Sequence, residues 1–128
     1  MEISVGELLE LNRIMNELSN QKLNTILAYK MARILKKVEA EVTIAEESRI
    51  KTIMPFVKKD EDGNPIINND SNTYETIEGK QNEISQALNE FFSTKIKLDL
   101  PTLNLKELEQ IQLTPRQVEV LMPIIDEE

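Results

Sequence analysis

The sequence predicts a mainly α, α+β domain in which antiparallel helices pack around one long central helix. Three observations predict this fold. Apolar residues recur every three or four positions from 24 to 54, with no Gly or Pro between them, which is typical of one side of an α-helix. Only three glycines occur in 128 residues, too few for the many tight turns of an all-β fold. Residues 58–76 and 95–100 instead carry turn formers and an alternating pattern, which predict a small β-hairpin or strand element.

The long helix is the main candidate for interaction. At 1.5 Å per residue its roughly 31 residues would reach about 46 Å, longer than a small domain is wide, so it needs a partner along most of its length. Its basic residues precede its acidic ones, which favours an antiparallel partner; the alternative is a solvated face without one. We predict that one apolar stripe of this helix supplies both the core and a self-association interface: Leu27, Met31, Ile34, Val38, Val42 and Ala45. The charged residues predicted to make contacts beside this stripe are Lys30, Arg33, Lys37 and Glu41.

Capping signals place two further helices. Ser4 and Glu7 have the spacing of a capping box, so we expect a first helix to begin there and to end near residues 19–20. The short connection that follows favours an antiparallel arrangement of this helix and the long one. Thr114 followed by Pro115, with Gln117 three residues after the Thr, predicts the start of a short C-terminal helix.

The region between these helices is less regular. Residues 58–76 contain two clusters of turn formers, and we predict either a small hairpin or a mobile loop there. A third helix should open at Thr76 or Glu78 and end near Thr94. Residues 95–100 alternate between apolar and polar, so we expect a strand that pairs with residues 66–67, with Tyr74, or with another chain.

The residue types argue against most enzyme chemistry. The chain has no His and no Cys, so the commonest general base, thiol nucleophiles and zinc ligands are absent. We predict no catalytic residues, no metal and no cofactor. The sequence around Gly63 resembles part of a calcium loop, but Lys58 and Asn69 then occupy two positions that need ligands, which favours a plain turn.

The charge and the hydropathy of the chain limit the classes of partner that it can bind. Acidic residues outnumber basic ones by 23 to 15, for a formal charge of −8, which disfavours direct binding of nucleic acid. There is no run of about eighteen apolar residues, so we expect no membrane span. We therefore expect one soluble, cytoplasmic domain over residues 1–128 that acts without catalysis through a protein partner, either a second copy or another protein.

The order of these motifs resembles a group of small uncharacterised proteins encoded by tailed phages and prophages of Gram-positive and gut bacteria. The resemblance covers nearly the whole chain and is carried by five segments: S-V-G-E-L-L-E-L at 4–11, A-Y-K-M-A-R-I-L-K-K-V-E-A-E at 28–41, K-K-D-E-D-G-N-P at 58–65, K-L-D-L-P at 97–101 and L-T-P-R-Q-V-E-V-L at 113–121. It implies a viral protein acting in the cytoplasm of an infected cell or in virion assembly.

The function predicted from these observations is that of an assembly, adaptor or host-takeover factor that self-associates through its long helix. An alternative is an acidic inhibitor of a host nucleic-acid-binding or defence protein. Acidic side chains compete with phosphate for a basic surface, so this alternative predicts salt-sensitive binding. A third hypothesis, a small carboxylate-dependent hydrolase, predicts that a divalent metal raises the melting temperature.

Overall fold

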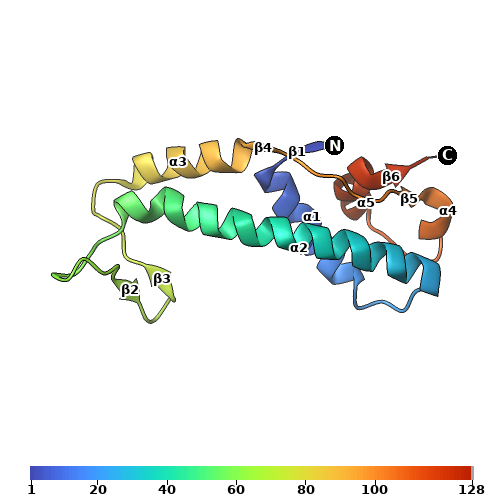
Figure 1. Cartoon of the computed structure of the whole chain (residues 1–128), viewed down its shortest axis with the longest axis horizontal. Coiled ribbons are helices and arrows are strands. Elements are labelled where there is room, and N and C mark those ends of the chain that lie inside the picture. The colour runs from blue at the N-terminus through green and yellow to red at the C-terminus, as the bar shows by residue number, and fades with distance from the viewer. Residues whose placement is uncertain (128) are drawn as a thin grey trace.

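A computed structural model of the chain describes residues 1–127 and is organised around one long helix. This helix, α2 (Thr25–Ile53), spans most of the length of the molecule (Figure 1). The side chain of Asn24 accepts a hydrogen bond from the backbone N–H of Leu27 and caps its start. Its end passes into a short 3₁₀ turn, η1 (Met54–Phe56), where Pro55 cannot continue the helical hydrogen bonding. The prediction of a long central helix is confirmed.

The first helix, α1 (Val5–Leu18), packs against α2 and runs in the opposite direction (Figure 1). Its start has the predicted capping box: Glu7 N–H donates to Ser4 Oγ at 3.1 Å, and Ser4 N–H donates to Glu7 Oε1 at 3.2 Å. The predicted capping box and the antiparallel arrangement of α1 and α2 are both confirmed.

The predicted strand at residues 95–100 is present in part, but its partner differs from the expected one. Strand β4 (Lys95–Lys97) pairs antiparallel with β1 (Glu2–Ser4), with Ile3 opposite Ile96. The expectation that it would pair with residues 66–67 or with Tyr74 is wrong, and its pairing with another chain stays a prediction. The hairpin lies at the far end of α2, and α3 carries the chain back from there to the start of α1 before the strand begins (Figure 1).

The C-terminal elements pack beside α1. The final helix has the predicted capping box, in which Gln117 N–H donates to Thr114 Oγ1 at 3.1 Å. A two-residue parallel strand pair, which the sequence did not indicate, joins the segment after Thr102 to the end of the chain. The elements of this part are β5 (Leu103–Asn104), α4 (Leu105–Leu108), α5 (Pro115–Leu121), η2 (Met122–Ile124) and β6 (Ile125–Asp126).

The far end of α2 carries a hairpin and a third helix. Strands β2 (Ile67–Asn68) and β3 (Thr73–Tyr74) form the predicted small antiparallel hairpin. Helix α3 (Gln81–Ser93) then lies along the second half of α2. A start at Thr76 or Glu78 is wrong, because Gly79 has a φ of 81° and so forms a left-handed turn just before the helix.

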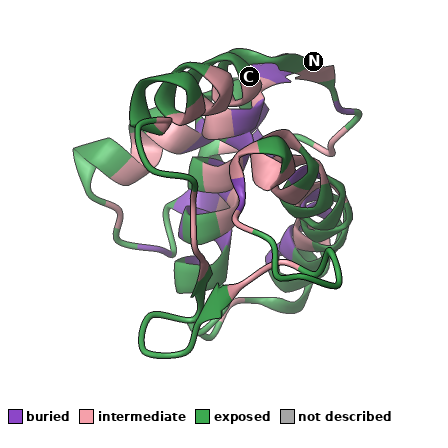
Figure 2. Ribbon diagram, turned by 90° about the vertical axis from the view of Figure 1, so that its left-hand side faces the viewer, coloured by how far each residue is buried: buried purple, intermediate pink, exposed green. Residues whose placement is uncertain are grey.

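Burial divides the molecule into two parts. We name residues 1–45 and 94–127 the core region and residues 46–93 the arm. Among the described residues of the arm, Val57 alone is fully buried, and Figure 2 shows the hairpin almost wholly as exposed or half-buried chain. The buried cluster lies entirely in the core region: Ile3, Val5, Leu8, Leu11, Ile14, Met15, Leu18, Leu27, Met31, Ile34, Val38, Ala45, Leu98, Leu103, Leu108, Ile111, Leu121 and Ile124.

The arm gives the protein a large surface for its mass. The accessible surface is 8799 Å². A compact monomer of 14.7 kDa has about 6900 Å² by the usual scaling of surface with mass. The difference, about 1900 Å², reflects an elongated shape in which α2 extends past the elements that cover its first half.

Candidate interaction surfaces

The predicted apolar stripe of α2 faces into the protomer. Its members are buried against neighbouring elements of the same chain, with α1 packed on the first half of the helix and α3 on the second. These side chains therefore form the core of one copy, whereas their part in an interface between copies stays a prediction. Buried are Leu27, Met31, Ile34, Val38 and Ala45, and Val42 is half-buried.

Two of the four predicted charged contacts bind α2 to the C-terminal part of the chain. Lys30 Nζ lies 2.8 Å from Glu107 Oε1 in an ion pair, and Lys37 Nζ donates to the backbone carbonyl of Asp99 at 2.9 Å. Glu41 is half-buried. These contacts are tertiary, so Lys30 and Lys37 stabilise the packing of one copy.

Glu107 joins the ion pair to a helix cap. Its Oε1 also accepts a hydrogen bond from the backbone N–H of Asn104 at 3.3 Å and completes the capping box of α4. The hydrogen bond from Lys30 is the main reason that the pKa of Glu107 lies below its ordinary value, and the Asn104 N–H adds to the effect against the opposing effect of burial. Glu107 is therefore ionised in the folded protein at neutral pH.

The opposite side of α2 is open to solvent. We name this side the outer face; in the view of Figure 1, α1 passes behind α2 and no element crosses in front of it. Three large apolar side chains stand on it: Ile26 is 70% exposed, Tyr29 65% and Ile44 56%. The guanidinium of Arg33, also exposed, lies 5.9 Å from the centre of the Tyr29 ring. The outer face consists of Ile26, Tyr29, Arg33, Ala40, Ile44, Glu47 and Lys51; Lys37, whose Nζ binds the Asp99 carbonyl, lies at its edge.

The amino-acid sequence also contains a signal for the outer face, separate from the buried stripe. Ile26 and Ile44 are eighteen residues apart, five turns of an ideal helix, so they lie on the same side. Tyr29 and Ala40 lie within the rotation of one residue, about 100° around the helix axis, from the side that carries Ile26 and Ile44. Periodicity alone does not tell which of two stripes on a helix will be covered, because that depends on where the other helices pack.

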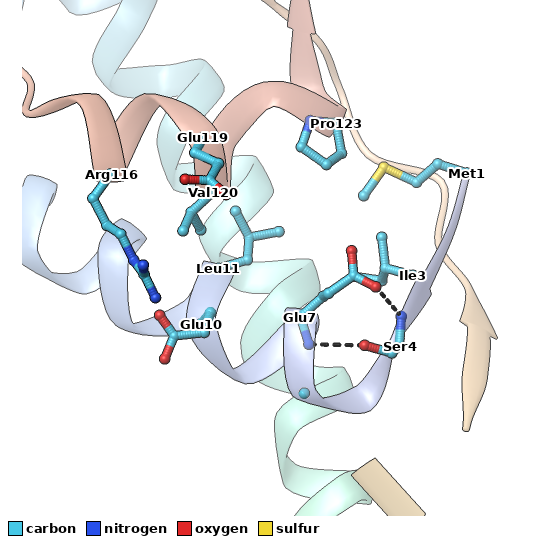
Figure 3. Close-up of a pocket in the computed structure, with 11 residues that line it drawn as sticks. Met1, Ile3, Ser4, Glu7, Glu10, Leu11, Arg116, Glu119, Val120 and Pro123 are labelled. Atoms are coloured by element: carbon cyan, nitrogen blue, oxygen red, sulfur yellow. Dashed lines mark hydrogen bonds between the residues drawn. The ribbon is translucent and has the colours of Figure 1, made fainter. Parts of the chain in front are cut away.

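A second candidate surface is a groove between the start of α1 and α5 (Figure 3). Its volume is about 360 Å³, which lies in the range of small ligand sites. Apolar walls come from four elements: β1 (Ile3), α1 (Leu11), α5 (Val120) and η2 (Pro123). The remaining lining residues are Met1, Ser4, Gly6, Glu7, Glu10, Arg116 and Glu119.

The carboxylates of this groove are largely occupied by contacts within the chain. The pKa of Glu7 is lowered mainly by hydrogen bonds from Ser4, and Lys95 Nζ lies 3.5 Å from its Oε1. The pKa of Glu10 is lowered mainly by its hydrogen bond with Arg13, at 2.9 Å, and to a smaller extent by the charge of Arg116. Figure 3 shows the guanidinium of Arg116 extended towards the Glu10 carboxylate. The groove is therefore polar at its rim and apolar within.

The structure offers little support for a calcium loop, a metal site or a membrane-spanning helix. Asp60 Oδ1 accepts hydrogen bonds from the backbone N–H groups of Asp62 and Asn64, which is the pattern of a plain Asx turn. Within residues 1–127, no group of three or more His, Cys, Asp or Glu side chains is placed to hold a metal ion. Over the same range, no helix is long and apolar enough to cross a membrane.

Comparison of the chain with protein-family models, with curated proteins and with solved structures gives no match.

Proposed function

We propose that this is a non-enzymatic protein that acts through protein–protein contacts and self-associates through α2. The observation that carries the proposal is the accessible surface of 8799 Å², about 1900 Å² more than a compact monomer of this mass exposes. This additional accessible surface includes the outer face of α2, on which Ile26, Tyr29 and Ile44 are exposed to solvent. Exposed apolar side chains along one helix face are a common mark of a protein interface.

The residue types support the non-enzymatic part of the proposal. A chain with no His and no Cys offers carboxylates, amines and hydroxyls alone as catalytic groups. In the groove, the Glu7 and Glu10 carboxylates already accept hydrogen bonds from their own chain. A viral origin, which the sequence resemblance implies, would place the self-associated protein in virion assembly or in host takeover within the infected cell.

Mass in solution tests this proposal. We expect light scattering across a hundredfold concentration range to approach twice the protomer mass of 14.7 kDa at the upper end. A mass that stays at that of one protomer throughout would contradict self-association. Addition of a divalent metal should leave the melting temperature unchanged, and a clear rise would instead favour the carboxylate-dependent hydrolase.

One observation favours a second function, that of an acidic inhibitor of a basic host protein. The groove between α1 and α5 combines an apolar interior with an acidic rim, to which Glu119 contributes beside Glu7 and Glu10, whose carboxylates also accept hydrogen bonds from their own chain. Basic side chains with long aliphatic stems match such a surface. We expect a basic host protein to be retained at low salt and released at high salt, and Glu119→Lys to abolish its retention. Retention that does not respond to salt or to this substitution would exclude the groove as the binding surface.

A further inference from the structure

We propose that two copies pair antiparallel along the outer face of α2, with Ala40 on the two-fold axis. This inference rests on the proposed self-association and specifies its surface, direction and register. Three observations carry it: the exposed apolar residues of the outer face, the separation of charge along the helix, and the area available for burial.

The apolar residues of the outer face are distributed along the helix. Ile26 and Tyr29 lie near its start, Ala40 near its middle and Ile44 one turn later, all exposed. The outer face is therefore apolar at intervals of roughly one to three turns and charged between them. This composition suits a two-helix contact in which charged pairs alternate with apolar contacts, because apolar side chains can pack on one another or beside the aliphatic stem of a Lys.

The charge pattern selects an antiparallel pair. Residues 25–38 contain Lys and Arg but no Asp or Glu, whereas residues 39–47 contain four Glu and no Lys or Arg. A parallel pair would place Arg33 against Arg33 of the partner subunit. On the outer face itself these charges are represented by Arg33 in the first half and by Glu47 in the second, with Lys51 one turn later. An antiparallel pair can therefore place Arg33 of each helix against Glu47 of the partner subunit, and the two-fold axis repeats that contact.

Ala40 fixes the register. Residues equally far from Ala40 on either side face each other across the axis. Arg33 then lies opposite Glu47 of the partner subunit, and Tyr29 lies opposite Lys51 of the partner subunit, which gives an ion pair and a cation–π contact on each side. The small side chain of Ala40 allows the two backbones to approach at the centre.

The third observation is the surface available for burial between two copies. A stable interface of standard size buries about 800 Å² on each partner. The outer face runs over residues 26–51 of α2, about 38 Å at 1.5 Å per residue, and the protomer as a whole exposes about 1900 Å² more than a compact monomer of its mass. A contact along this length therefore has the dimensions of a two-helix interface. The residues that α1 and α3 cover stay buried, so pairing requires no rearrangement of the core.

Cross-linking tests direction and register together. The chain has no native Cys, so single-cysteine variants can be labelled without further changes. With a short bismaleimide, we expect Ala40→Cys to form covalent dimers and Ile26→Cys to form few. In the proposed pair the two Ile26 positions are 28 residues apart along the axis, about 42 Å. Efficient cross-linking of both variants would indicate a parallel pair, and cross-linking of neither would place the interface elsewhere.

Charge reversal gives a second test that does not depend on a reagent. Arg33→Glu should weaken dimerisation about tenfold or more, because each of the two symmetric ion pairs becomes a repulsion. Combining it with Glu47→Arg should restore the dimer, since the exchanged charges again face each other. Lys22→Glu, in the exposed connection between α1 and α2, is the matched control and should leave the dimer unchanged.

These outcomes separate the inference from the function on which it rests. A wild-type dimer in which Ala40→Cys fails to cross-link, or in which the double reversal fails to restore pairing, overturns the inference and leaves self-association standing. A wild-type protein that remains monomeric contradicts both.

Discussion

The core region and the arm share one helix but are stabilised differently. In the core region, α1 and the C-terminal elements cover the inward side of α2, and side chains such as Leu27, Ile34 and Val38 are fully buried. In the arm, the same helix is accompanied by α3 and the hairpin, and Val57 is the one described residue that is fully buried. The comparison shows that the apolar period of a helix sets which side can be buried, whereas the neighbouring elements determine how much of that side is buried.

The largest expected effect comes from placing a charge in the core region. Val38→Asp should unfold the protein, because an unpaired carboxylate buried at that position costs several kcal/mol, which is comparable with the whole stability of a domain of this size. Circular dichroism measures the loss of helix. Ala32→Asp, at an exposed position of the same helix, is the control and should keep the fold. A folded Val38→Asp protein with an unchanged melting curve would contradict this description of the core.

Truncating an isoleucine in each region compares them directly. Ile34→Ala should destabilise the protein by about 2–5 kcal/mol, the usual range for a fully buried large apolar side chain. Ile84→Ala, in α3, should cost about 1 kcal/mol, because that side chain is half-buried and the site is already partly hydrated. Urea unfolding at one fixed protein concentration measures both. Equal losses at the two positions would show that the arm is as firmly packed as the core region.

The smallest expected effect concerns pH and the Lys30–Glu107 pair. The pKa of Glu107 in the folded protein lies below its ordinary value of about 4.5. The pair therefore contributes stability that is present above that pH and is lost as the pH falls through the lower, folded-state pKa. Glu107→Gln should reduce the acid dependence of the melting temperature while keeping the capping box of α4, since Gln also accepts the Asn104 hydrogen bond. An identical acid dependence in the variant would show that the pair contributes nothing.

Features that depend on nearby residues could be predicted from the sequence. The capping boxes at Ser4 and Thr114 and the long helix each depend on a few neighbouring side chains, and the structure has all of them. The start of α3 differs from the sequence prediction because Thr76 and Glu78 have the residue types of a helix start, whereas Gly79 forms a left-handed turn after them and the helix begins at Gln81.

Features that depend on distant residues could not be predicted. Strand β1 is three residues long, and its partner Ile96 lies more than ninety positions from Ile3, so neither segment alone indicates the pairing. The groove between α1 and α5 exists only because two ends of the sequence meet there. The sequence predicted the stripe of α2 that is buried, whereas the exposure of Ile26 and Ile44 on another side of the same helix could not be predicted, because it depends on where the other elements pack.

The pairing of β1 with β4 also determines the order in which the protein can fold. The hairpin and the α1–α2 pair join segments that are close in sequence, so their loops close at little entropic cost. The β1–β4 ladder and the packing of α5 on α1 need residues near both ends of the chain. During synthesis, α1 and α2 therefore emerge from the ribosome before β4 and α5, so the side of α1 that packs on α5 stays uncovered until that helix has been translated.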